Sequence, residues 1–222
     1  MKTDKELGKR VFAHLKSLGL ETPVTDLVHV ADETKIEQIV PLFKQIMEVL
    51  GLDLNDDSLA ETPHRVAKMY VREIFYGLNY DNWPKLTVIS NRMSCRDEYV
   101  LERSIKFNST CEHHFLPILG VNGGCHVAYI PNKHVIGLSK INRVVKFFSH
   151  APSVQERTTH QILVALQFLL ETEDVAVCID AVHTCVSTRG IEDGTSSTST
   201  AAIGGVFKTD KQIRQEFFSN CK

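Results

Sequence analysis

The chain has 222 residues, 43% of them hydrophobic, and a formal net charge of -2. This length and composition suit one large globular domain, or one domain with a helical extension, and the charge argues against a generally basic nucleic-acid-binding protein. With no apolar leader after Met1 and no apolar run long enough to span a bilayer, we expect a cytoplasmic protein with neither a nucleic-acid nor a membrane partner.

Helical spacing dominates the first part of the chain, residues 1–84. Apolar residues recur three and four positions apart in residues 5–18 and 34–50, which predicts two helices. An extended linker is expected between them over residues 22–32, and Gly51 should end the second helix. Together these segments predict a helical N-terminal region.

A third helix is predicted after residue 61. Thr62 is expected to be its N-cap, with Pro63 at the first helical position, where the missing N–H of proline costs nothing. Arg65 and Lys68 share a face separate from the apolar stripe of this helix. From the spacing alone, that basic face is most simply a solvated helix surface.

The pattern changes to strands and helices over residues 85–222. Two consecutive helices are predicted, one capped by Ser139 and one opened by Ser153 and Glu156 with capping-box spacing. A last helix is expected over residues 208–219. Strands are predicted around these helices at residues 86–90, 98–107, 125–130, 175–186 and 201–207. Hairpin connections without βαβ alternation favour an α+β domain with an antiparallel sheet.

Two short motifs carry the groups that bind metals. Cys111-Glu112-His113-His114 follows one predicted strand, and His183-Thr184-Cys185 lies on another. Their two thiols and three imidazoles are the ligand types that zinc prefers. On a strand, His183 and Cys185 would point to the same face. The spacing therefore predicts zinc bound by a subset of these five groups, with at least one group left for chemistry.

The residues leave the type of zinc site open. A structural site would be closed by four ligands, as in a zinc-stabilised binding module, whereas a catalytic site keeps three and a water. Adjacent His113 and His114 rarely reach one metal together, so one imidazole is expected to move protons. Glu112 either orients a histidine or is a surface charge. A zinc nucleobase deaminase is disfavoured because its H-x-E and P-C-x-x-C motifs are missing.

The remaining cysteines are expected to be incidental buried residues. In a reducing compartment a chain of this size does not need structural disulfides. These cysteines are Cys95, Cys125, Cys178 and Cys221.

The segment Ser109–His114 closely resembles the zinc motif of the GTP cyclohydrolase I family. The resemblance covers roughly residues 34 to 218 and extends through several further segments. These are Glu61–Tyr70, Ala128–Pro131, Ile136–Arg143, Val154–Arg157, His183–Cys185 and Arg189-Gly190. The sequence departs from the family at Leu119–Cys125, a glycine-rich segment that is longer than expected and is predicted to form a loop.

The resemblance implies a T-fold, in which an antiparallel sheet is backed by two helices. It also implies conversion of GTP and water to formate and 7,8-dihydroneopterin triphosphate, the first step of tetrahydrofolate and pterin biosynthesis. The expected cofactor is one zinc per subunit, bound by Cys111, His114 and Cys185, with His113 and His183 transferring protons. The expected assembly is a homo-oligomer, a decamer, whose sites are shared between subunits.

The resemblance also assigns residues to the substrate. It places Glu156, with Gln155 beside it, at the guanine edge, although Glu156 could instead complete the capping box. Ser139 is expected at the ribose. The groups expected at the triphosphate are Lys140, Arg143 and Arg189, with Arg65 and Lys68 contributed by a neighbouring subunit.

Overall fold

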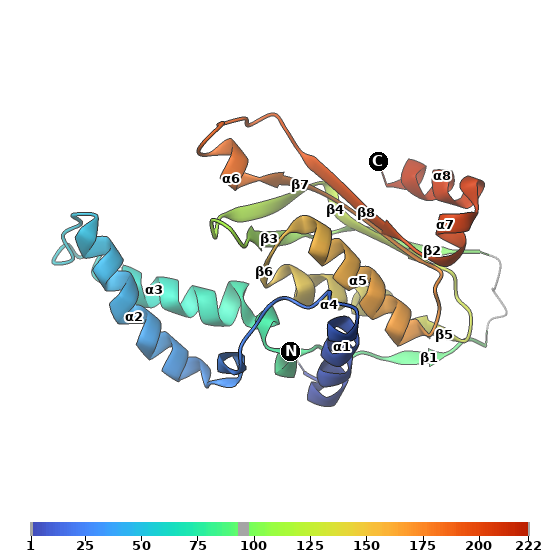
Figure 1. Cartoon of the computed structure of the whole chain (residues 1–222), viewed down its shortest axis with the longest axis horizontal. Coiled ribbons are helices and arrows are strands. Elements are labelled where there is room, and N and C mark those ends of the chain that lie inside the picture. Colours follow the sequence, from blue (N-terminus) through green and yellow to red (C-terminus); the bar gives the residue numbers. More distant parts are fainter. Residues whose placement is uncertain (1, 93–97, 222) are drawn as a thin grey trace.

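A six-stranded sheet forms the centre of the computed structural model, which describes residues 2–92 and 98–221. Helices α4 (Leu138–Ser149) and α5 (Gln155–Leu170) cover one face of this sheet. Helices α7 (Gly205–Thr209) and α8 (Lys211–Asn220) cover the other face (Figure 1). The chain is therefore a mixed α+β protein, as predicted.

Strand β4 (Pro117–Tyr129) organises the sheet because it pairs on both of its edges. Strands β2 (Val100–Ile105) and β3 (Asn108–Cys111) pair with it antiparallel along one edge, and β7 (Val175–His183) along the other. Beyond β7, β8 (Thr198–Ile203) is also antiparallel, whereas β6 (Pro152–Ser153) pairs parallel with β3. Separately, β1 (Val88–Ser90) pairs with β5 (His134–Ile136). The sequence did not predict β3, β5 or β6.

Alternating side chains of β7 build two cores, one on each face of the sheet. Val177 and Ile179 are fully buried against the α4 and α5 side. Ala176 and Cys178 point the opposite way and pack with Phe207 of α7 and other residues beneath α8. Both sets are apolar because helices cover both faces, so β7 reads as a continuous hydrophobic run.

The N-terminal helices differ in whether they pack against the core. Helix α1 (Lys5–Ser17) buries Val11 and Leu15 in the core shared with α5. Helices α2 (Asp32–Val49) and α3 (Thr62–Lys68) form an arm that projects from the body of the chain (Figure 1). The expected linker is not wholly extended, since Asp26–His29 forms a 3-10 helix. Beyond α3 the chain continues as a π-helix, Met69–Ile74.

The three predicted N-caps are wrong. The capping positions are Glu61 for α3, Gly137 for α4 and Val154 for α5, and none makes a side-chain cap hydrogen bond. Ser153 lies in β6, held by its pairing with β3, and its hydroxyl donates to the Val154 carbonyl at 3.1 Å. Glu156 is therefore not part of a capping box.

The predicted loop at residues 120–124 is instead a bulge inside β4. The register of β4 against β7 shifts between Gly120 and Cys125. Gly123 and Gly124 have φ values of 89° and 79°, in a backbone region that residues other than glycine rarely adopt. A Cβ at Gly124 would also lie 2.9 Å from the Ile105 carbonyl oxygen. The glycine-rich segment therefore bends a continuous strand.

Three other segments depart from the predicted elements. The strand expected over residues 175–186 ends at His183, and Cys185 lies in the short helix α6 (Thr184–Ser187). The strand expected over residues 201–207 is divided between β8 and α7. The turn expected between the first two strands falls partly on residues 93–97, which lie outside the described residues. Within the described ranges, none of the helices has the length and apolarity to cross a bilayer.

Candidate active site

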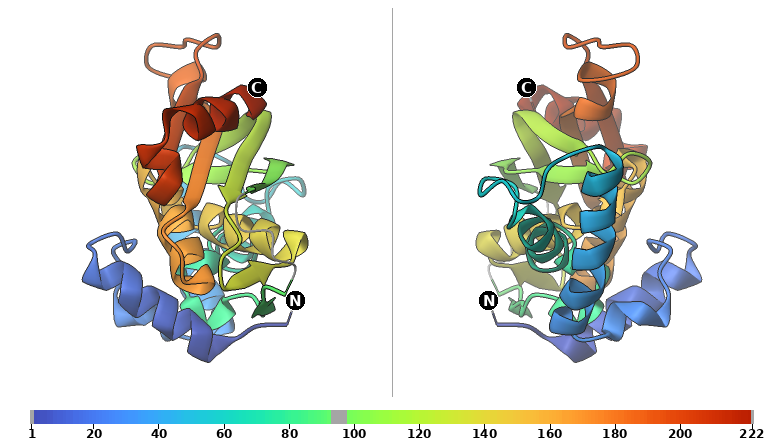
Figure 2. Two further views of the ribbon diagram at one scale, coloured as in Figure 1. Left: turned by 90° about the vertical axis from the view of Figure 1, so that its right-hand side faces the viewer. Right: turned by 90° about the vertical axis from the view of Figure 1, so that its left-hand side faces the viewer.

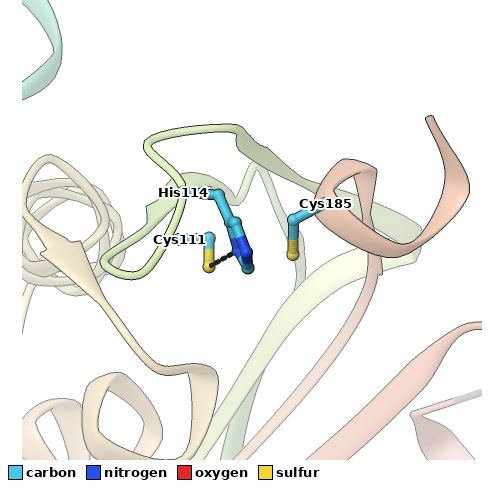
Figure 3. A group of neighbouring side chains, drawn as sticks. All are labelled: Cys111, His114 and Cys185. Carbon is cyan, nitrogen blue, oxygen red and sulfur yellow. Dashed lines mark hydrogen bonds between the residues drawn. The ribbon is translucent and has the colours of Figure 1, made fainter. Parts of the chain in front are cut away.

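Cys111, His114 and Cys185 converge at one end of the sheet. Cys111 is the last residue of β3, His114 lies in the turn that leads to β4, and Cys185 lies in α6 just after β7. The two segments meet because β4 pairs with both β3 and β7, with Ile118 opposite His183. The ligand atoms of the three residues all lie within 4.8 Å of one another (Figure 3).

The donor set suits zinc. Cys111 Sγ lies 3.8 Å from His114 Nδ1, close to the separation of about 3.5 Å expected for sulfur and nitrogen ligands of one tetrahedral zinc. Burial and the adjacent Cys111 thiol raise the pKa of Cys185. A dication between the two sulfurs would reverse that effect, because it favours both thiolates. Among the residues described, this is the one cluster suited to a metal, and it does not include His183.

His113 lies beside this cluster on the same turn. Its Nδ1 is 3.8 Å from Cys111 Sγ, and its side chain is 64% exposed. Glu112 approaches His113 Nε2 at 4.0 Å and is held from the other side by Arg157, whose guanidinium donates at 2.5 and 3.4 Å. Glu112 is thus a fixed carboxylate next to an accessible imidazole, and not a free surface charge.

His183 is the last residue of β7 and contacts the N-terminus of α5. Its Nε2 lies 2.8 Å from Gln155 Oε1. Burial lowers the pKa of His183, and the charge of Glu156 acts in the opposite direction. Glu156 itself is exposed at the first turn of α5. His183 and Glu156 are therefore close enough to interact, at the edge of the metal cluster.

Arg189 contacts the imidazole of His114. Its Nη1 lies 2.7 Å from His114 Nε2, and because arginine only donates hydrogen bonds, Nε2 is the acceptor. A metal-bound imidazole uses one nitrogen for the metal and carries its proton on the other. Arg189 therefore cannot keep this bond to a metal-bound His114 and would be released. It lies in the segment after α6 that projects beyond the sheet (Figure 2).

Five other predicted substrate residues lie away from the cluster in a single chain. Helix α4 begins two residues after β5. Lys140 lines a cavity with Tyr129, at the end of β4 away from Ile118, which pairs with His183 beside the cluster. Ser139 and Arg143 lie within one turn of Lys140. Arg143 donates to the Lys85 carbonyl at 3.3 Å. Arg65 and Lys68 are exposed on the projecting arm. The chain by itself does not bring the whole predicted set together.

The contacts of Arg157 and Phe115 were not predicted from the sequence. The Arg157–Glu112 ion pair spans 45 positions and exists because β6 pairs parallel with β3 just before α5 begins. The Phe115 ring packs 5.3 Å from that of Phe75 and links the metal turn to the base of the arm. Neither contact has a local signal in the sequence, since both depend on tertiary pairing.

The other cysteines in the described ranges lie outside the cluster. Cys125, Cys178 and Cys221 are buried, and the five cysteines in the described ranges are free thiols. Cys95 lies outside the described residues.

Comparison with known proteins identifies the family of this chain. The family model described as GTP cyclohydrolase I matches residues 39–222. The chain is 57% identical over 213 residues to GTP cyclohydrolase 1 of Photobacterium profundum, covering 96% of each chain. It is 58% identical over 207 residues to that of Serratia proteamaculans, covering 93% of this chain and 91% of the relative. The chain belongs to the GTP cyclohydrolase I family of enzymes.

Proposed function

We propose that the chain converts GTP and water to formate and 7,8-dihydroneopterin triphosphate, at the start of pterin and tetrahydrofolate biosynthesis. The observation that carries this proposal is the convergence of Cys111, His114 and Cys185 beside His113 and His183, in a member of this family. We also propose that the sheet and the two helices that back it, α4 and α5, form a T-fold.

The proposed cofactor is one zinc per subunit, bound by Cys111, His114 and Cys185. Three protein ligands leave a coordination position open, and zinc in such a site supplies Lewis acidity and an activated water. His183 is not among the residues whose ligand atoms lie within 4.8 Å of one another. This favours a catalytic site over a closed structural site of the kind that a binding module would use.

The imidazoles are proposed to move protons during the opening of the guanine five-membered ring. His113 would protonate N7, which makes C8 electrophilic toward water, and its exposure allows it to reach the substrate. The Glu112 carboxylate, fixed by Arg157, lies 4.0 Å from Nε2 of this imidazole. His183 is the proposed acid/base for the later steps, in which formate has left and the ribose opens and recloses on the diamine.

Glu156 is the proposed guanine-recognition residue. Its carboxylate is exposed and is not used in a helix cap. A carboxylate can accept from both N1–H and the exocyclic amine of guanine. The position of Glu156 next to His183 would place the base against the proton-transfer groups.

The triphosphate is proposed to bind a cluster of cations assembled from more than one subunit. Arg189 is beside the metal cluster in the same chain. Lys140 and Arg143, with Ser139 for the ribose, would come from a second copy because the start of α4 lies by the end of β4 away from the metal cluster. Arg65 and Lys68 would come from the arm of a neighbour. The proposed assembly is a homodecamer, and the exposed apolar side chains of the arm support a buried subunit contact. These are Leu42, Ile46, Val49 and Leu50.

Incubation of zinc-loaded protein with GTP tests the function directly. We expect stoichiometric formate and a product that becomes a fluorescent pterin on oxidation. Release of ammonia without formate would indicate deaminase chemistry and would overturn the proposal. Metal removal with a chelator should abolish formate release while the far-UV circular dichroism persists; unfolding on chelation would favour the structural site.

A further inference from the structure

A closed hydrogen-bond network fixes the orientation of the Gln155 side chain. Gln155 is 1% exposed, at the first turn of α5. Its Nε2 lies 3.0 Å from the carbonyl oxygens of Ile179 and Thr198, and 3.1 Å from Thr200 Oγ1. Carbonyl oxygens only accept, so the amide nitrogen must face β7 and β8 and the amide oxygen must face away from them.

The hydroxyls of Thr159 and Thr200 have defined hydrogen-bond directions as well. Thr159 Oγ1 donates its one hydrogen to the Gln155 backbone carbonyl at 2.7 Å. In the 2.7 Å contact between Thr159 and Thr200, the Thr200 hydroxyl must then be the donor. Having given its hydrogen to Thr159, Thr200 Oγ1 can only accept from Gln155 Nε2, whose two hydrogens are shared among three acceptors. The amide nitrogen of Gln155 therefore faces acceptors on β7 and β8.

The orientation of Gln155 in turn fixes the proton on His183. Gln155 Oε1 is an acceptor without a hydrogen, and it lies 2.8 Å from His183 Nε2. We infer that Gln155 is a positioning residue that keeps a proton on Nε2 of His183, which leaves Nδ1 as the nitrogen that exchanges protons with substrate. Gln155 is then not a guanine contact, contrary to the expectation from the family resemblance.

This inference rests on the proposed function for its role in catalysis, but the tautomer can be measured without activity. Solid-state NMR of the full chain labelled with ¹⁵N-histidine, with the His183 signals identified by their loss in His183→Asn, reports which nitrogen is protonated. We expect the shifts of a protonated Nε2 and an unprotonated Nδ1 in the neutral ring. A neutral ring protonated at Nδ1 overturns the inference, even if formate is released from GTP.

Two variants separate positioning from substrate binding. Thr200→Val keeps both carbonyl acceptors of Gln155 and should keep the Nε2-protonated tautomer. Gln155→Ala removes the acceptor and should lower kcat by about 10- to 100-fold with a much smaller change in KM, as for other groups that orient a functional histidine. A raised KM with a relaxed preference for GTP over ITP would instead restore Gln155 as a guanine contact.

Discussion

Two thiols of this chain differ from its other described cysteines in their surroundings. Cys111 and Cys185 face an imidazole at one end of the sheet. Cys221 instead follows α8 and packs in the second core with Cys178 and Phe207. Cys185→Ser should reduce bound zinc to a small fraction of one per subunit and lower activity by at least about 100-fold, because a serine hydroxyl is a poor zinc ligand. Metal analysis of the purified variant measures the first effect.

The matched control is Cys221→Ser, which changes the same atom outside the cluster. It should retain full zinc occupancy and activity, although its buried hydroxyl should cost some thermal stability. Equal zinc loss in both variants would mean that the metal depends on overall folding and not on the Cys185 sulfur.

Individual residues were predictable where the sequence carries a local pattern. The C-x-x-H spacing of Cys111 and His114 already fits one turn, so these two could be paired from the sequence. The contact between His183 and Gln155 could not, because it joins residues 28 positions apart through the pairing of α5 with β7 and β8. The same holds for Arg157, whose partner is fixed by a two-residue parallel strand.

At the scale of elements, periodicity located the helices but not their ends. The repeat that predicted α1 reflects a face buried against the core, whereas much of the repeat that predicted α2 is exposed on the arm. The cap predicted for α5 failed because Ser153 is held in β6 by its pairing with β3. The glycine-rich segment of β4 was misassigned because a bulge and a loop require the same residues.

One contact between elements should make the stability of the fold depend on pH. His150 follows α4, its ring lies 4.8 Å from that of Tyr76, and its backbone carbonyl accepts from Gly77 at 2.9 Å. Burial lowers the pKa of His150 below its ordinary value of 6.5, and this outweighs the hydrogen bond to the Lys146 carbonyl. The folded state therefore binds fewer protons there than the unfolded state just below pH 6.5.

The sign of the effect follows from that difference. The stability contributed by neutral His150 is present above pH 6.5 and is lost as the pH falls from 6.5 toward the lower pKa of the folded state. His150→Phe keeps a ring against Tyr76 and cannot titrate, so its Tm should fall less than that of the unaltered chain between neutral and mildly acidic pH. His64→Gln, at an exposed histidine, should leave the pH dependence unchanged. If Tm changed equally with pH in the unaltered chain and in both variants, His150 would be excluded as the source of the pH dependence.

At the scale of the whole molecule, the exposed arm and the incomplete site both favour an oligomer. The arm carries an apolar surface that one chain leaves exposed, with Val49 87% and Leu50 71% accessible. Of the cations predicted for the triphosphate, Arg189 lies beside the metal cluster, whereas Lys140 lies by the opposite end of β4. Both features are explained if the protein works as a closed oligomer in which neighbouring copies complete each site. The sequence alone could not show this division, because residue spacing does not reveal which groups share a chain's site.

Mixed oligomers of two inactive variants test directly whether each site takes groups from two subunits. Cys185→Ser removes the metal cluster, and Lys140→Ala removes a cation that we assign to the neighbouring copy. If the two groups come from different subunits, random 1:1 mixing by co-expression should leave roughly a quarter of the sites with both groups intact. Formate release per site, measured against each variant alone, should rise accordingly.

The control pair is Cys185→Ser with Cys111→Ser. Both ligands lie in one chain within the same cluster, so every site in this mixture lacks one of them and no activity should return. Recovery in the first mixture alone would place Lys140 in the site of its neighbour. If the first mixture also stays inactive although mass spectrometry shows mixed oligomers, Lys140 must act on the substrate within its own chain. The α4 end of the molecule would then have to approach α6 by a rearrangement that this fold does not show.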